Sequence, residues 1–104
     1  MCGIAGLMTA DGSAPHPAIL DRMAAAIAHR GPDGRGDYAE ADVAMTQLRL
    51  AIIDLETGDQ PLFAPATDKA GRLALIANGE IYNYIELRQQ MDDIAYATGA
   101  DCES

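Results

Sequence analysis

Tryptophan is absent from this chain of 104 residues, and aromatic residues make up only 5% of it. This composition excludes a surface of stacked aromatic rings of the kind that binds single-stranded nucleic acid. Seven lysines and arginines stand against sixteen aspartates and glutamates, so the net charge is −9. Such an excess of negative charge disfavours nucleic acid and anionic membrane surfaces. We therefore expect no nucleic acid and no membrane among the partners.

Histidine and cysteine are scarce, with two of each, and none of them has the spacing of a zinc site. We therefore expect no metal. No apolar run reaches the ~20 residues that span a bilayer. The stretch MCGIAGLMTADG is a poor signal peptide, because it has no basic leader and glycines break its apolar part. The sequence thus predicts a cytoplasmic chain in which Cys2 and Cys102 are free thiols.

The residues that are present fit one small globular domain, with a hydrophobic fraction of 49%. Apolar residues at spacings of three and four predict a helix over 17–29, and Gly31 and Pro32 end it. Short apolar runs between turn residues predict strands, and a second helix follows near the end. The predicted strands are 2–8, 37–40, 43–53 and 73–77, and the first and last of them are expected to be buried. The second helix is predicted over 84–91, and an irregular loop over 61–71. This order fits an α+β domain whose sheet is unfinished, as in a fragment of a longer protein.

Cys2 is the first candidate for a catalytic residue. Removal of Met1 would leave a thiol and a free α-amine on one residue, which is a complete pair of nucleophile and base. In unperturbed peptides these groups titrate at about 8.5 and about 7.7–8.0, close to neutral pH. We expect the mature protein to begin at Cys2. The alternative is that position 2 holds an ordinary small apolar residue.

Asn78 and Gly79 have two interpretations. An Asn-Gly pair is the favoured turn of a two-residue β-hairpin, because both residues tolerate positive φ. The same tight turn can expose the Asn78 side-chain amide and the Gly79 backbone N–H side by side, as two donors of an oxyanion hole.

The sequence also leaves the roles of several charged residues undecided. Arg49 lies in an apolar stretch, so it either faces water from a strand or is buried with an anion, because arginine binds carboxylates bidentately. Asp101 is explained as a turn former and Glu80 as a solvated strand residue. A helix end followed by a turn explains every residue of HRGPDG at 29–34.

Taken together, five stretches resemble the glutaminase domain of class II glutamine amidotransferases, in the asparagine-synthetase branch. The stretches are MCGIAGL at 1–7, HRGPDG at 29–34, RLAIIDLETGDQPL at 49–62, NGEIYNY at 78–84 and TGADCE at 98–103. They follow the family's order and cover essentially the whole chain. The resemblance implies an N-terminal-nucleophile hydrolase fold, a four-layer αββα sandwich of two stacked antiparallel sheets between helical layers, here truncated.

The resemblance also implies the chemistry. Cys2 would be the nucleophile, its own amine would carry the proton, and Asn78 and Gly79 would supply the oxyanion donors. L-glutamine and water would give glutamate and ammonia through a γ-glutamyl thioester. In the full-length enzyme the ammonia would feed ATP-dependent synthesis of asparagine from aspartate.

For the substrate, the resemblance implies a clamp on the amino-acid end of glutamine. Arg49 would hold the α-carboxylate, and Asp101 and Glu80 would hold the α-ammonium group. The backbone of four further residues would line the same pocket: Leu50, Ala51, Ile52 and Ile53.

The chain is shorter than members of this branch, which continue into a synthetase domain. Residues 1–104 would be the N-terminal part of a glutaminase domain with no cofactor, and ATP and Mg are expected only in the missing synthetase domain. The unfinished sheet suggests a homodimer or association with another chain. Two alternatives remain: a truncated fragment that is catalytically incompetent, or a glutaminase that serves a different amide acceptor.

Overall fold

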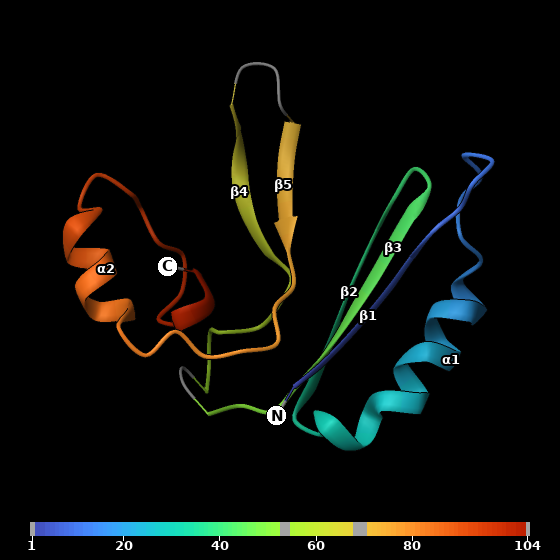
Figure 1. The fold of residues 1–104 in the computed structure, drawn as a ribbon, viewed down its shortest axis with the longest axis horizontal. Helices are drawn as coiled ribbons and strands as arrows, with labels where there is room; N and C mark the ends of the chain where they lie inside the picture. The colour runs from blue at the N-terminus through green and yellow to red at the C-terminus, as the bar shows by residue number, and fades with distance from the viewer. Residues whose placement is uncertain (1, 53–54, 68–70, 104) are drawn as a thin grey trace.

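The computed structural model describes residues 2–52, 55–67 and 71–103. Its elements are two antiparallel sheets, two α-helices and two short 3₁₀ turns (Figure 1). In chain order they are β1 (Gly3–Met8), α1 (Pro17–Ile27), η1 (Ala28–Arg30), β2 (Gly34–Glu40), β3 (Val43–Arg49), β4 (Leu62–Thr67), β5 (Gly71–Leu75), α2 (Tyr84–Gln90) and η2 (Asp101–Glu103). The predicted α+β class is confirmed. No helix in the described ranges is long and apolar enough to cross a membrane.

The first sheet has three strands in the order β1-β3-β2, all antiparallel. In its register Gly3 lies opposite Leu48, and Gly34 lies opposite Arg49. Helix α1 packs against β1 and β3 on one face of this sheet, as Figure 1 shows on its right-hand side. The apolar core of the layer is made by Leu20, Ala24, Ala44 and Leu48.

Alternation along β3 decides which side chains face α1 and which face the opposite side. Leu48 pairs with Gly3, and a β carbon at Gly3 would contact α1, so Leu48 belongs to the helix-covered face. Successive side chains of a strand point to opposite faces. Gln47 and Arg49 therefore point away from α1, and Cys2, one residue before Gly3, shares that face with them.

Two glycines allow close packing around this sheet. A β carbon at Gly31 would lie 2.2 Å from the backbone of Leu48, and one at Gly36 would lie 1.6 Å from the carbonyl oxygen of Gln60. Real β carbons do not approach other atoms so closely. Glycine at position 31 therefore lets the turn after η1 lie against β3, and glycine at position 36 lets the loop before β4 lie directly on β2, on the face that carries Gln47 and Arg49.

The second sheet consists of β4 and β5, paired antiparallel. The predicted irregular loop over 61–71 is therefore wrong. Pro65 within the run lowers its apparent strand propensity, but proline is tolerated on an edge strand, and both strands of a two-stranded sheet are edges. The predicted strand 73–77 is displaced to β5, and its expected burial is wrong because Leu73 and Leu75 are exposed.

The other predicted elements are present with shifted boundaries. Strand β2 begins at Gly34 rather than 37, β3 ends at Arg49 rather than 53, and α1 ends at Ile27 before the turn η1. Strand β1 is not the buried strand that was expected. It lies at the edge of its sheet, and Ile4 and Met8 are exposed.

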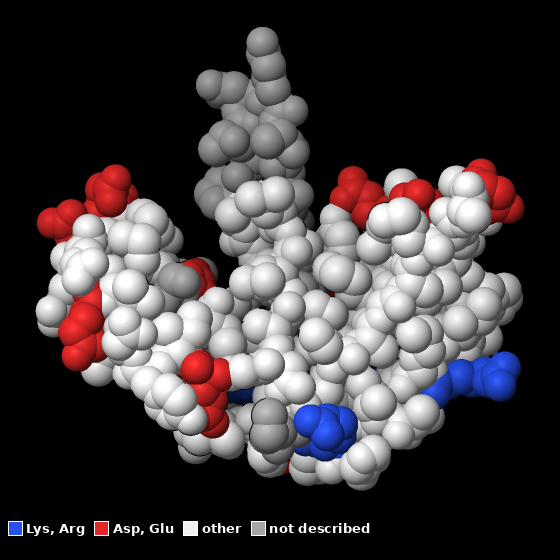
Figure 2. Space-filling view, viewed as in Figure 1, with Lys and Arg blue, Asp and Glu red and all other residues white. Residues whose placement is uncertain are grey.

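Charge is distributed unevenly over the face shown in Figure 2. Acidic side chains lie over α2, at the upper end of the three-stranded sheet and low in the view to the left of centre, whereas basic side chains are sparse and lie near the bottom centre and at the right-hand edge beside α1. This face carries no broad basic patch, in line with the net charge of −9.

Candidate active site

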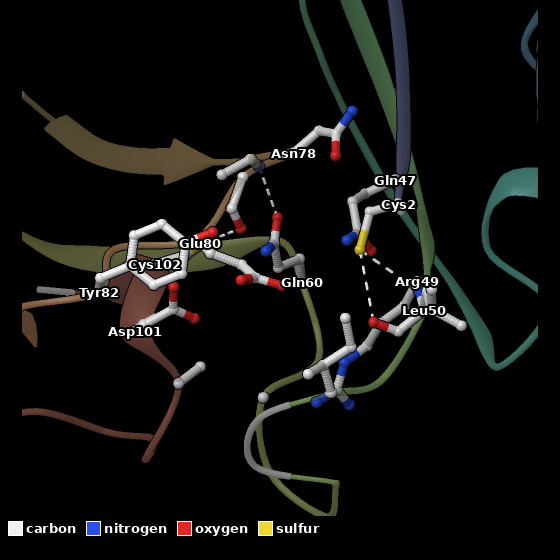
Figure 3. Close-up of a pocket in the computed structure, with 15 residues that line it drawn as sticks. Cys2, Gln47, Arg49, Leu50, Gln60, Asn78, Glu80, Tyr82, Asp101 and Cys102 are labelled. Atoms are coloured by element: carbon white, nitrogen blue, oxygen red, sulfur yellow. Dashed lines mark hydrogen bonds between the residues drawn. The ribbon is translucent and has the colours of Figure 1, made fainter.

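A cavity of about 350 Å³ lies between the end of the three-stranded sheet and the segment that follows β5 (Figure 3). Eight of the ten residues predicted for the site line it: Cys2, Arg49, Leu50, Ile52, Asn78, Gly79, Glu80 and Asp101. Ala51 does not line the cavity, and Ile53 lies outside the described residues. The fold thus brings the beginning, the middle and the end of the chain to one place.

Cys2 is half-buried immediately before β1, and its sulfur is held by the backbone of Leu50. The Leu50 N–H donates to Sγ at 3.3 Å, and the thiol donates to the Leu50 carbonyl oxygen at 3.6 Å. Arg30 Nε donates to the carbonyl oxygen of Cys2 at 3.1 Å. The residue is therefore fixed at both its side chain and its backbone. Both cysteines are free thiols, as expected.

The stretch at 29–34 does more than end a helix. Besides the bond from Arg30, Asp33 accepts a hydrogen bond from the Ala51 N–H at 2.9 Å, and its own N–H donates to the Arg49 carbonyl oxygen at 2.9 Å. The motif therefore positions both Cys2 and the chain that follows β3. Arg30 and Asp33, two residues of opposite charge within this short stretch, are the feature of the sequence that points to contacts with distant parts of the chain.

Arg49 is buried, with 7% of its surface exposed, so the interpretation that it faces water is wrong. Its Nη1 donates to Asp59 Oδ1 at 2.8 Å, while the Asp59 side chain is 79% exposed. Arg49 thus lines the cavity, and its guanidinium is paired with an acidic side chain at the surface. A carboxylate brought by a ligand can compete with that partner, because arginine binds carboxylates with directed, charge-assisted hydrogen bonds.

The hairpin interpretation of Asn78 and Gly79 is wrong. Strand β5 pairs with β4, which precedes it, and the chain continues from Gly79 through a turn into α2. Neither residue has positive φ, since the described residues with positive φ are Ala41 and Gly12. Both line the cavity, and Figure 3 shows the Asn78 side chain extending toward the strand that carries Cys2. Their role as oxyanion donors stays a prediction.

Asp101 and Cys102 close the cavity on the side opposite the three-stranded sheet. Asp101 is buried, and its Oδ2 accepts a hydrogen bond from the Ile81 N–H. The Cys102 thiol donates to the Gly79 carbonyl oxygen at 3.5 Å. Burial, and then the neighbouring carboxylate of Asp101, raise the pKa of the Cys102 thiol. Cys102 therefore stays protonated at neutral pH and acts as a donor, although nothing in the sequence distinguishes it from an incidental residue.

Sequence reasoning also missed two glutamines. Gln60 accepts a hydrogen bond from the Ala77 N–H at 2.6 Å, which fastens the loop before β4 to the segment after β5. Gln47 is buried and lines the cavity beside Cys2 and Arg49. Its position two residues before Arg49, on the same face of a strand, is a signal that could have found it. Gln60 lies in a turn-rich stretch that carries no such signal.

A metal site finds no support in the part of the chain that the structure describes. There, no group of three or more histidine, cysteine, aspartate or glutamate residues is placed so that it could hold a metal ion.

Residues 1–104 match the family described as "Glutamine amidotransferase domain". Among curated proteins, the chain is 41% identical over 105 residues to "Asparagine synthetase [glutamine-hydrolyzing]" of Asparagus officinalis. It is 40% identical over 105 residues to "Asparagine synthetase [glutamine-hydrolyzing] 1" of Arabidopsis thaliana, and 37% identical over 108 residues to "Asparagine synthetase [glutamine-hydrolyzing] 2" of Bacillus subtilis (strain 168). Each similarity covers 99% of this chain, which spans 17% of the length of the two plant relatives and 14% of the bacterial one.

Proposed function

The chain belongs to the class II glutamine amidotransferase domain family and is homologous to the N-terminal part of asparagine synthetase, and on this premise we propose that Cys2 hydrolyses L-glutamine to glutamate and ammonia. The family predicted from five short stretches is thereby confirmed. One observation carries the proposal: Cys2, Arg49 and Asp101, which are far apart in the sequence, line a single cavity.

In the proposed complex, the cavity holds the amino-acid end of glutamine by charge. Arg49 binds the α-carboxylate, and Asp101 and Glu80 bind the α-ammonium group. Both acidic residues lie on the C-terminal side of the cavity, across from the strand that carries Arg49. A substrate held at both charged groups presents its carboxamide in a fixed orientation, and positioning of this kind supplies part of the rate enhancement.

The reaction then proceeds in two halves. The sulfur of Cys2 attacks the carboxamide carbon, and the oxygen that becomes negative accepts hydrogen bonds from the Asn78 side chain and the Gly79 N–H. The α-amine of Cys2, free once Met1 is removed, takes the thiol proton and passes it to the leaving nitrogen. Ammonia departs and leaves a γ-glutamyl thioester. Water then cleaves the thioester to glutamate and restores the thiol.

The length of the relatives supports a larger arrangement. We propose that residues 1–104 form the N-terminal part of a glutaminase domain, and that its two sheets belong to a four-layer αββα sandwich completed by further residues. In that arrangement a synthetase domain uses ATP and Mg to make asparagine from aspartate and the released ammonia. The names of the relatives and the 14–17% of their length that the chain spans support this arrangement.

The proposal is tested by incubating the natural polypeptide that contains this chain with L-glutamine. We expect glutamate and ammonia in equal amounts, because the thioester route releases one of each. Mass spectrometry of the same sample establishes whether Cys2 is the first residue. A polypeptide that begins at Cys2 and releases neither product would contradict the proposal.

Asp59 is expected to compete with the substrate for Arg49. Asp59→Asn removes the competing carboxylate, and since Asp59 is mostly exposed, the pair contributes only about 0.2–1 kcal/mol. We expect the KM for glutamine to fall about threefold, with kcat little changed. Steady-state kinetics measures the change, and Asp21→Asn, which breaks an ion pair to Arg35 near α1, is the matched control. A higher KM in the Asp59 variant would instead make Asp59 a residue that positions Arg49.

A further inference from the structure

Gln47 has a polar group that the described protein does not satisfy. Its side chain is among the largest that are fully buried, with 1% of the residue exposed. The Nε2 atom is buried and has no hydrogen-bond partner in the described part of the chain. Buried polar groups are nearly always hydrogen-bonded, and a donor left without an acceptor destabilises the folded state. This exception therefore calls for an acceptor that the described residues do not supply.

The register of the sheet places this donor beside the proposed nucleophile. Gln47 lies opposite Ile4 on β1, and the face that it shares with Ile4 also carries Cys2 and Arg49. Residues that are diagonal across an antiparallel pair are within reach of long side chains. Figure 3 shows the carboxamide of Gln47 on the side of the cavity where the sulfur of Cys2 lies, whereas the Arg49 guanidinium extends toward the loop that carries Asp59.

The loop before β4 closes the space around Gln47. Gly36 lies opposite Gln47 on β2, and the carbonyl oxygen of Gln60 occupies the place of the missing β carbon. Gln47 thus lies between β1 on one side and this loop on the other, and it lines the cavity.

We propose that Gln47 is a substrate-binding residue whose Nε2–H donates a hydrogen bond to the carboxamide oxygen of bound glutamine. The inference rests on the proposed function, because glutamine brings the acceptor. Gln47 Oε1 can accept an N–H from the same carboxamide, so that the two amide groups pair edge to edge. This pairing recognises the reacting end of the substrate, while Arg49 recognises the α-carboxylate.

The test uses the natural polypeptide with Cys2→Ala, which holds substrate without turning it over, and measures binding by calorimetry. L-glutamine is compared with L-norvaline, which has the same α-groups and a methyl group in place of the carboxamide. We expect Gln47→Met to weaken glutamine binding about tenfold, the contribution of one hydrogen bond, and to leave norvaline binding within about twofold. The melting temperature should rise, because methionine fills the space without a buried unpaired donor.

Two matched variants separate binding from folding. Gln89→Met makes the same change at an exposed position on α2 and should alter neither affinity nor stability. Thr46→Val removes a buried hydroxyl that donates to Asp37 on the other face of β3, so it should lower stability and leave glutamine affinity unchanged. If Gln47→Met does not fold, Gln47→Asn provides a second test. Asparagine keeps the amide donor on a side chain that is one methylene shorter, so it should weaken glutamine binding more than norvaline binding.

The possible outcomes are distinct. Unchanged glutamine affinity in Gln47→Met, or equal loss for both ligands together with a lower melting temperature, would overturn the role of Gln47 and leave the proposed function standing. Absence of glutamine binding to the Cys2→Ala polypeptide that keeps Gln47 would instead contradict the proposed function itself.

Discussion

Replacing Cys2 by alanine is expected to abolish glutamine hydrolysis, with a loss on the order of 10⁴ or more. In the proposed mechanism the sulfur makes and breaks the bond to the carboxamide carbon, so the variant would have no covalent route. Cys102 lines the same cavity but does not substitute for it, because its thiol donates to Gly79 and its pKa is raised. The measurement is the rate of glutamate release at saturating glutamine, with ammonia-dependent asparagine formation followed in parallel.

Two comparisons make this result specific. Asparagine formation from added ammonia should survive in the Cys2 variant, since it bypasses the glutaminase site. Cys102→Ser, which keeps a hydrogen-bond donor for the Gly79 carbonyl oxygen, should lose far less glutaminase activity than Cys2→Ala. A Cys2 variant that still hydrolyses glutamine, or one that loses both activities equally, would contradict the proposed division of chemistry.

Local patterns in the sequence predicted those helices and strands whose formation depends mainly on neighbouring residues. Helix α1 follows from its apolar periodicity, and β3 lies within the longer strand that the sequence predicts over 43–53. Strand β4 was missed because Pro65 argues against a strand until its place in a two-stranded sheet is known. The hairpin interpretation of Asn78 and Gly79 fails because the partner of β5 precedes it in the chain, and no local pattern reveals that choice of partner.

The candidate site depended on a different kind of information. The family resemblance placed Cys2, Arg49 and Asp101 in one site, although a local reading left each of them an ordinary alternative. The burial of Arg49 could not be read from its neighbours, because it arises when the loop around Asp59 and Gln60 folds onto β2. Such contacts depend on tertiary packing, and so does the cavity that Gln47 lines.

Arg49→Ala is expected to raise the KM for glutamine about 100-fold while kcat falls much less. Hydrogen bonds to charged groups contribute about 1.5–3 kcal/mol each, so losing the guanidinium removes most of the affinity for the α-carboxylate. In the proposed complex this interaction is made equally in the ground state and the transition state, and its loss should therefore appear mainly in KM. Asp59 remains solvated when its partner is removed, since it is 79% exposed, so the variant is expected to fold.

The control for this variant is another arginine in the same sheet. Arg35 on β2 pairs with Asp21 and Asp37 near α1, away from the cavity, so Arg35→Ala should leave the KM for glutamine unchanged. Arg49→Lys tests geometry against charge: lysine keeps the charge but loses the planar pair of donors, and its KM should lie between those of the parent and Arg49→Ala. An Arg49→Ala enzyme with an unchanged KM would place the α-carboxylate elsewhere, and the buried guanidinium would then have a structural role that includes its ion pair with Asp59.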